Sequence, residues 1–304
     1  MIVNLSIRKL SPVLGAEVLN ITLSEPLDNT TFNAIQKAWY ENIALVFRNQ
    51  HLSAADLVAF SRRFGELDIA PPNENGRCNA KGFEEILVIS NVIENGKAIG
   101  SLGSKEIPWH TDMSYTENPP LGITLYGVEV PPVDGGKTEF VNMYKAFETL
   151  PSELKRKVEQ LSIKHDCSIN AAGYLRLGSE PVTDVVTCPG PVHPIVRTHP
   201  VTGRQALYLG RRRNAYIPGL SVQQSEELLD ELWNHCTQTQ LKWHHNWQVG
   251  DLLFWDNFCT IHRRDPFDPN SRRVLYRTQF RPKLPQLQVD QTRSLTTGTL
   301  AKAY

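Results

Sequence analysis

Apolar residues at helical spacing predict four helices in this chain. Asp28 and Ser53 are polar residues of the kind that cap helices, and each precedes a stretch with apolar side chains three or four positions apart. Ser53 and Asp56 also match a capping box. The four expected helices cover about residues 30–41, 53–64, 151–161 and 221–236.

The remaining apolar runs are short and typical of strands. They lie at about residues 43–47, 86–89, 123–126, 205–209, 251–255 and 274–280, between Pro and Gly turn signals. Helices do not alternate regularly with these runs, which disfavours a doubly wound parallel sheet. The pattern favours a mainly β sandwich or jelly roll with packing helices. The stretch 165–205, rich in Gly, Pro and Thr, is a candidate lid or insertion.

Length and charge bound the class of protein. The 304 residues, 40% of them hydrophobic, suit one all-β domain, so we expect residues 1–304 to form a single domain. The 32 basic residues equal the 32 acidic ones, which argues against nucleic acid or an anionic membrane as partner. Basic residues nevertheless cluster at Arg211–Arg213 and Arg263–Arg264, and a small anionic ligand is one explanation.

Cysteine usage and the N-terminus predict a cytoplasmic location. The five cysteines are scattered and form no C-x-x-C pair, which indicates a reducing compartment. The first residues lack the basic and apolar regions of a signal peptide. No apolar run approaches the roughly 18 residues of a membrane span. We therefore expect a soluble protein without a membrane partner.

The string Trp109-His110-Thr111-Asp112 is the strongest chemical signal. If it forms a strand, His110 and Asp112 point to the same side and can hold one ion. A third ligand should then come from a distant strand, and His262 is the natural candidate. Two imidazoles and one carboxylate are typical of non-haem iron(II) oxygenases. A His–Asp pair that merely fixes a loop is the alternative.

A threonine and two arginines could bind an anion near this site. Thr138 follows a Gly-Gly turn, and its hydroxyl could donate to a carboxylate, although a β-favouring threonine after a turn needs no ligand. Arg273 and Arg277 are four residues apart on the run 274–280 and its edge, so they share one face. Two inward arginines require an anion, whereas two outward ones would be unremarkable.

Together these motifs resemble those of the taurine dioxygenase and 2,4-dichlorophenoxyacetate dioxygenase family. The motifs are W-H-T-D, G-G-K-T, W-D-N-x-x-x-x-H and R-R-x-x-x-R, in this order. The likeness runs from about Leu10 to Pro282 and includes segments 14–18, 63–67 and 193–200. His193 and His199, in the last of these, resemble framework residues of the family.

The resemblance implies a double-stranded β-helix, a cupin-like jelly roll, with iron(II) held by His110, Asp112 and His262. It places Thr138 and Arg273 on the distal carboxylate of 2-oxoglutarate. Trp255 is expected to pack beside the metal site. The implied reaction consumes O2 and converts 2-oxoglutarate to succinate and CO2 while a C–H bond of the substrate is hydroxylated. Because Asp112 is present where related halogenases have no carboxylate ligand, hydroxylation is expected rather than chlorination.

The resemblance also suggests the substrate class. Arg277 matches a position that grips the acidic group of the substrate in several family members, so we expect a small acidic substrate. Ala70 and Asn73 stand where taurine enzymes have a His and a Tyr, so taurine is not expected. Further candidates for substrate contact are Met113, Tyr115, Arg211, Arg212 and Arg213. A solvated charge run is the simpler explanation of the three arginines.

Two other functions remain open at this point. A metal-binding jelly roll without oxygenase activity would not need Thr138 and Arg273. A zinc hydrolase would be four-coordinate, often with an H-E-x-x-H helix that is absent from this sequence, and would not need a buried arginine at 273. We also expect a homo-oligomer, as an untested prediction.

Overall fold

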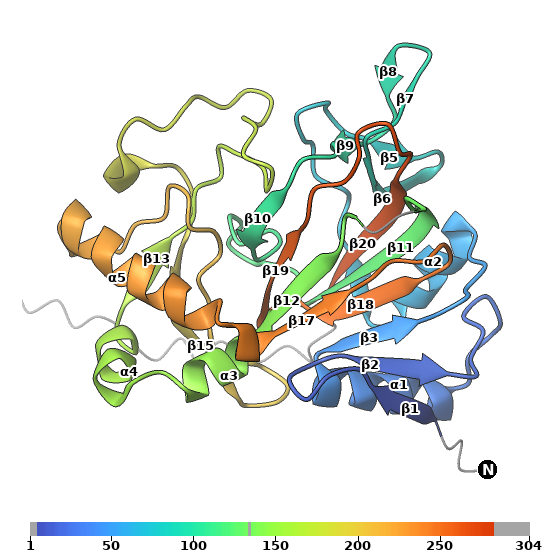
Figure 1. Cartoon of the computed structure of the whole chain (residues 1–304), viewed down its shortest axis with the longest axis horizontal. Helices are drawn as coiled ribbons and strands as arrows, with labels where there is room; N and C mark the ends of the chain where they lie inside the picture. The colour runs from blue at the N-terminus through green and yellow to red at the C-terminus, as the bar shows by residue number, and fades with distance from the viewer. Residues whose placement is uncertain (1–4, 133–134, 283–304) are drawn as a thin grey trace, which may run out of the picture.

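The structure, a computed structural model, describes residues 5–132 and 135–282. The largest β-sheet of the described chain has ten strands (Figure 1). Its main path runs in the order β1 (Ser6–Lys9), β2 (Ala16–Leu19), β3 (Ala44–Phe47), β18 (Leu252–Asp256), β11 (Gly122–Glu129), β20 (Val274–Pro282), β6 (Phe83–Ser90) and β5 (Asn79–Ala80). Two short strands lie off this path: β4 (Gly65–Leu67) pairs with β20, and β9 (Ser101–Leu102) pairs with β6.

A four-stranded sheet packs against the inner face of the large one. Its strands are, in order, β10 (Ile107–His110), β19 (Thr260–Arg264), β12 (Thr138–Asn142) and β17 (Lys242–His245). Neighbouring strands are antiparallel, so side chains at paired positions share a face. The two facing sheets confirm the predicted jelly roll, because strands distant in sequence enclose one interior.

Two helices cover the outer face of the large sheet: α1 (Asn29–Asn42) and α2 (Ala54–Arg62). Trp39 of α1 stacks on Phe254 of β18 with ring centroids 4.3 Å apart. The next residue, Trp255, points to the opposite face and packs between the sheets. Ser53 and Asp56 form the predicted capping box.

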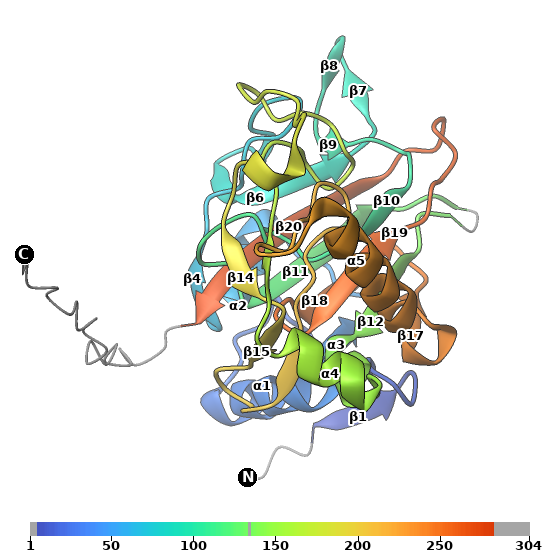
Figure 2. The same ribbon diagram turned by 90° about the vertical axis from the view of Figure 1, so that its left-hand side faces the viewer.

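The remaining helices gather beside the small sheet (Figure 2). They are α3 (Met143–Glu148), α4 (Ser152–Val158), α5 (Val222–Cys236) and the short 3-10 turns η1 (Val185–Thr187) and η2 (Thr239–Leu241). Helix α5 begins with a second capping box, Ser221 with Gln224. The four predicted helices are therefore confirmed, although α4 ends at Val158, three residues before the predicted end.

Three small two-stranded units complete the described chain. They are β7 (Ile93–Glu94) with β8 (Lys97–Ala98), β13 (Ser162–Lys164) with β14 (Val192–Pro194), and β15 (Val196–Thr198) with β16 (Gln205–Leu207). Residues 165–184, in the predicted lid, contain no helix and no strand beyond an isolated bridge. Helices long and apolar enough to cross a membrane do not occur in the described parts of the chain.

Candidate functional site

His110, Asp112 and His262 meet between the two sheets. All three side chains are buried, and their potential ligand atoms lie within 4.8 Å of one another. Each imidazole Nε2 is 3.7 Å from a different oxygen of the Asp112 carboxylate. Among residues 5–132 and 135–282, no other group of three His, Cys, Asp or Glu side chains has this geometry.

Strand pairing positions the two histidines, whereas a turn positions the carboxylate. His110 is directly opposite His262 in the pairing of β10 with β19. The prediction that Asp112 lies in the same strand as His110 is wrong, because β10 ends at His110. The chain turns there: the Thr111 N–H donates to the Gly210 carbonyl, which draws the backbone out of the sheet.

Asn257 holds the backbone of Asp112 in place. Its Oδ1 accepts from the Asp112 N–H at 3.0 Å, and its Nδ2 donates to the Asp112 carbonyl at 2.9 Å and to the Pro120 carbonyl at 3.0 Å. Asn257 was not among the predicted site residues. The signal was available, because Asn257 belongs to the W-D-N motif that precedes His262.

The protonation states suit a divalent cation. His110 Nδ1 lies 2.8 Å from the Pro108 carbonyl, so it carries the proton and leaves Nε2 free to ligate. Burial, followed by the charge of His110, lowers the pKa of His262 to about 3, so its imidazole is neutral at pH 7. Burial would raise the pKa of Asp112, but Arg277 and the histidines outweigh it and keep the carboxyl ionised.

The donor set therefore fits iron(II). Two imidazoles and one carboxylate on one side of an ion are the facial arrangement of non-haem iron oxygenases. Asp112 Oδ2 is buried without a hydrogen-bond partner among the described residues, so it has a free lone pair facing His262. A buried orphaned oxygen is costly unless a cation or donor meets it.

A cavity extends from these side chains between the two sheets, and we call it the strand cavity. Its polar wall is formed by Thr138, Arg264, Arg273 and Arg277 together with the His–Asp–His cluster. Its apolar wall comes mainly from Ile89, Leu102, Ile107, Leu125 and Trp255. Most of these residues lie on strands of the two sheets, so sheet register fixes their positions.

The structure brings the three predicted cosubstrate residues into this cavity. The Trp255 ring centroid is 5.1 Å from that of His262, so the indole packs against a cluster residue. The Thr138 hydroxyl accepts from the Trp247 indole at 3.0 Å, which leaves its own proton free to donate. Arg273 is 2% exposed, and its Nη2 donates to the Gly136 carbonyl at 3.3 Å.

Arg273 has no carboxylate partner among the described residues. Its Nε is buried without any hydrogen-bond acceptor. Burial, followed by the charge of Arg264, lowers its pKa well below the ordinary value for arginine. The neighbouring Arg272 lies on the outer side and pairs with Glu129 and Glu94. An uncompensated buried guanidinium is the expected state of a site built for an anionic ligand.

A second cavity adjoins the cluster on the other side, and we call it the loop cavity. Loop residues form most of its wall: Pro71, Asn73, Thr111, Met113, Tyr115, Ala171 and Arg176. His110, Asp112, Arg211 and Arg277 complete its polar lining. Of the predicted substrate residues, Ala70 is not part of this lining; it is buried, and its N–H donates to the Glu84 carbonyl.

Arg277 lines both cavities. Its Nη1 donates to Asp112 Oδ1 at 2.7 Å, and its Nη2 donates to Gln279 Oε1 at 3.3 Å. Arg277 and Arg273 both reach the strand cavity, as expected for residues four apart on one strand face. The contact with a candidate metal ligand was not predicted, because it depends on the turn that carries Asp112 inward.

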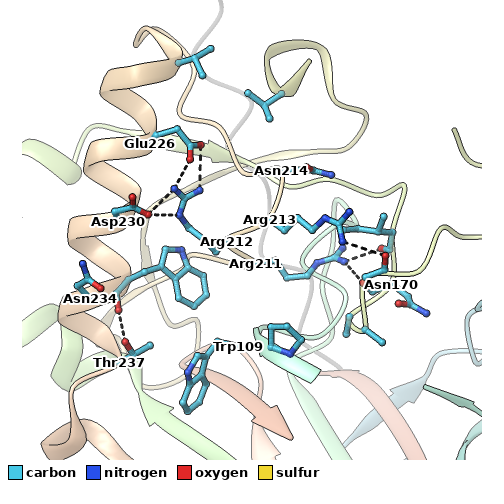
Figure 3. A pocket seen from close by; sticks show the side chains of 18 residues that line it. Trp109, Asn170, Arg211, Arg212, Arg213, Asn214, Glu226, Asp230, Asn234 and Thr237 are labelled. Carbon is cyan, nitrogen blue, oxygen red and sulfur yellow. Dashed lines mark hydrogen bonds and ion pairs between the residues drawn. The ribbon is translucent and has the colours of Figure 1, made fainter. Parts of the chain in front are cut away.

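The three consecutive arginines after Gly210 point to different surroundings (Figure 3). Arg211 donates to the carbonyls of Asp166, Ile169 and Asn170 at 2.7–2.9 Å, so it fastens the predicted lid segment to the site. Arg212 pairs with Glu226 and Asp230 of α5. Arg213 is exposed and donates to the Gly173 carbonyl. Of the three, the structure brings only Arg211 to the loop cavity.

A larger cavity of about 790 Å³ lies between β10 and α5 (Figure 3). Trp109, which alternates with His110 along β10, forms part of its wall, so it lies on the opposite face of that strand. It shares Ala171 and Arg211 with the loop cavity. The His–Asp–His cluster does not line it.

Arg176 is a second site residue that sequence reasoning missed. Its guanidinium lies 4.1 Å from the centroid of the Tyr115 ring and donates to the Ile169 and Pro72 carbonyls. It comes from the irregular segment 165–184, where no periodicity announces which side chains point inward. The framework interpretation of His193 and His199 agrees with their contacts, to the Ser114 and Thr116 carbonyls and to Asp256 respectively.

Comparison with known proteins gives consistent matches over most of the chain. Residues 6–279 match the family model described as taurine catabolism dioxygenase TauD, TfdA family. The alpha-ketoglutarate-dependent 2,4-dichlorophenoxyacetate dioxygenase of Cupriavidus pinatubonensis is 34% identical over 275 residues, which cover 88% of this chain and 94% of that protein. Pentalenolactone F synthase of Streptomyces avermitilis is 32% identical, with 86% and 89% covered.

Solved structures agree with this result. A taurine dioxygenase from Burkholderia xenovorans superposes with a TM-score of 0.74 at 30% identity, over 92% of this chain and 90% of that one. AAD-2 in complex with Mn(II) and N-oxalylglycine gives the same TM-score of 0.74 at 28% identity, over 92% of this chain and 98% of that one.

Proposed function

The chain belongs to the taurine catabolism dioxygenase TauD, TfdA family, and on this premise we propose that it hydroxylates a small organic anion other than taurine. The protein is an iron(II)- and 2-oxoglutarate-dependent dioxygenase, an oxidoreductase that couples O2 and the decarboxylation of 2-oxoglutarate to oxidation of its substrate. What we add to family membership is the assignment of residues and of substrate charge.

We assign the metal to His110, Asp112 and His262. When bound there, iron(II) supplies the oxygen chemistry, and the protein supplies position and exclusion of water. The orphaned Asp112 Oδ2 and the neutral imidazole of His262 support this assignment. Asn257 acts through Asp112, because it fixes the backbone of the only ligand that does not lie on a strand.

We assign the distal carboxylate of 2-oxoglutarate to Arg273 and Thr138. A guanidinium can bind a carboxylate through two parallel hydrogen bonds, and the unpartnered Nε of Arg273 is available for one of them. The free hydroxyl proton of Thr138 provides another donor. These groups are attached to strands or strand ends, so the cosubstrate would meet a rigid, preformed site.

The substrate assignment rests on one observation: Arg277 is buried beside the cluster and lines both cavities. The loop cavity contains three guanidinium groups, and Asp112 is its only lining carboxylate. A metal cation would also draw on the charge of Asp112, so an acidic substrate group is needed to balance Arg277. Relatives are named for carboxylates such as 2,4-dichlorophenoxyacetate and phenoxypropionate, and one for sulfate esters.

Exclusion of taurine rests on Ala70 and Asn73, which stand where the taurine enzymes are expected to have a His and a Tyr. Ala70 lies outside the lining of the loop cavity, and Asn73 is within it. Ala70 has no side-chain donor for a sulfonate, and the amide of Asn73 is shorter than a phenol and accepts from Arg176. The rival zinc hydrolase and non-catalytic module both fail to explain the buried, unpaired Arg273.

The test is a screen of matched pairs of substrates. Carboxylates, sulfonates and sulfate esters, each with an uncharged amide or ester analogue, are assayed for succinate release above the uncoupled rate. We expect at least one acid to stimulate turnover and its neutral analogue to do so at least roughly tenfold less, since a charge-assisted hydrogen bond contributes about 1.5–3 kcal/mol.

The Arg277→Leu variant should abolish this stimulation while binding of 2-oxoglutarate and of Mn(II), measured by calorimetry, is retained. Arg272→Leu is the matched control, because Arg272 is an exposed arginine at the edge of the same strand. Equal turnover of acid and neutral analogue would refute the proposed substrate class. Loss of Mn(II) binding in Arg277→Leu would instead assign Arg277 to support of Asp112.

A further inference from the structure

Arg264 is a buried arginine that has no role in the metal, 2-oxoglutarate and substrate assignments made above. It lies on β19 two residues after His262, so the two side chains point to the same face of the small sheet. It is also paired directly with Thr138 across β12 and β19. Arg264 is 5% exposed and lines the strand cavity together with Thr138 and Arg273.

Most of the hydrogen-bonding capacity of Arg264 is unused. Its Nη2 donates to the carbonyls of Leu102 and Lys105, which secures the chain between β9 and β10. Its Nε and Nη1 are both buried and have no acceptor among the described residues. Leaving such donors unpaired costs free energy, so a purely structural role explains one nitrogen and leaves two unexplained.

The preceding residue shows the contrast. Arg263 points to the outer face of β19, where it pairs with Glu139, Glu106 and Asp265. Arg264, on the inner face, has no carboxylate partner among the described residues. Thus carboxylates of the protein neutralise the charge of Arg263, whereas the charge of its neighbour Arg264 has no such compensation.

Arg264 and Arg273 both line the strand cavity and both lie near the ring of Phe267. Their guanidinium carbons lie 5.2 and 5.4 Å from the centroid of the Phe267 ring. The charge of Arg264 contributes to the lowered pKa of Arg273, which means that the two cations repel each other. Two buried cations in one small cavity require an anion that both can reach.

We propose that Arg264 is a second anion-binding residue of the cosubstrate site, so that Arg264 and Arg273 together hold the distal carboxylate of 2-oxoglutarate. This inference rests on the proposed binding of 2-oxoglutarate in the strand cavity. A carboxylate has about four lone-pair positions and can accept from two guanidinium groups at once. The consequence is selectivity: the site should reject 2-oxo acids that lack the distal carboxylate.

The experiment measures binding without turnover. Calorimetry on the Mn(II)-loaded protein gives dissociation constants for 2-oxoglutarate and for 2-oxovalerate, which has a methyl group in place of the distal carboxylate. In Arg264→Met, we expect 2-oxoglutarate to bind roughly 10- to 150-fold more weakly, as for loss of hydrogen bonds to a charged group. Binding of 2-oxovalerate should change less than about threefold, because it never used Arg264.

Arg263→Met is the matched control and should leave both constants unchanged. If Arg264→Met does not fold, Arg264→Gln keeps a donor for the Leu102 and Lys105 carbonyls and should show the same selective weakening. Unchanged 2-oxoglutarate affinity, or equal weakening of both ligands, would overturn the role of Arg264. If the wild-type protein binds no 2-oxoglutarate, the proposed function is itself refuted. If Arg273→Met loses 2-oxoglutarate binding but Arg264→Met does not, the proposed function is supported and the role of Arg264 is refuted.

Discussion

The strand cavity and the loop cavity are both lined by His110, Asp112 and Arg277, but the rest of their walls is built differently. Thr138, His262 and Arg264 are set by the register of neighbouring strands, where a slip of one residue would turn each side chain to the other face. Asn73, Tyr115, Arg176 and Arg211 come from separate loops and irregular segments. Rigid strands suit chemistry common to a family, whereas loops can change with the substrate.

The arginines of the two cavities differ in the same way. In the loop cavity, Arg211 and Arg176 donate mainly to backbone carbonyls, so their hydrogen bonds hold the wall together. In the strand cavity, Arg264 and Arg273 keep three buried nitrogens without acceptors. Unsatisfied buried donors therefore distinguish the arginines of the proposed 2-oxoglutarate site from those that hold the wall of the loop cavity.

The largest effect should come from loss of a proposed metal ligand, because His110 and Asp112 line both cavities and His262 completes their cluster. His262→Ala leaves two of the three proposed ligands, and we expect turnover to fall by roughly a thousandfold or more, since metal catalysis contributes several kcal/mol. Metal content and succinate release measure the effect. His244→Ala, which removes an exposed histidine on β17, is the control. Near-normal turnover of His262→Ala would show that His262 is not a metal ligand and would refute the proposed metal site.

A smaller effect should be confined to the strand cavity. Arg273→Ala removes the proposed partner of the 2-oxoglutarate carboxylate, which costs about 2–5 kcal/mol, or roughly 30-fold to several thousandfold in affinity. Titration of the Mn(II) protein with 2-oxoglutarate checks this value. Arg272→Ala should bind normally, because Arg272 is exposed and paired with surface carboxylates. If both variants bind equally well, the cosubstrate lies elsewhere.

The smallest effect should be confined to the loop cavity. Arg211→Met frees segment 166–170 from three hydrogen bonds that position the wall of the loop cavity. We expect the KM for substrate to rise by roughly tenfold, which corresponds to about 1.4 kcal/mol. Affinity for 2-oxoglutarate should not change. Arg212→Gln breaks only partly exposed ion pairs with α5 and should alter neither constant. A matching loss of 2-oxoglutarate affinity in Arg211→Met would show that the two cavities are not independent.

Part of this site could be predicted from the sequence. The spacing between His110 and Asp112 and the W-D-N motif before His262 identified the cluster that the structure assembles. The four-residue spacing of Arg273 and Arg277 correctly suggested a shared inner face. Arg264 could have been found by the same period-two rule applied from His262, because β19 continues through both residues.

Other features of the site could not be predicted. Asp112 reaches the cluster through a turn after β10, stabilised by Asn257 from a remote loop. The W-D-N motif marks Asn257, but no local pattern shows that its partner is the backbone of Asp112. Arg211, Arg212 and Arg213 are chemically identical neighbours, yet one enters the loop cavity, one pairs with α5 and one is exposed. Their fates depend on which carbonyls and carboxylates the rest of the chain brings near.

The sequence by itself determined the features that depend on residues close together along the chain. These are the capped helices at Ser53 and Ser221, the strand-forming runs and the types of ligating side chain. Caps and periodicities act through neighbours in sequence, so they can be read locally. Tertiary structure alone decided which buried charges are neutralised, because the partners are distant along the chain, as for Arg277 and Asp112, which are 165 residues apart. Arg263, on the outer face of β19, pairs with carboxylates, whereas Arg264, on the inner face, lines a cavity. Only the packing of the two sheets creates this difference.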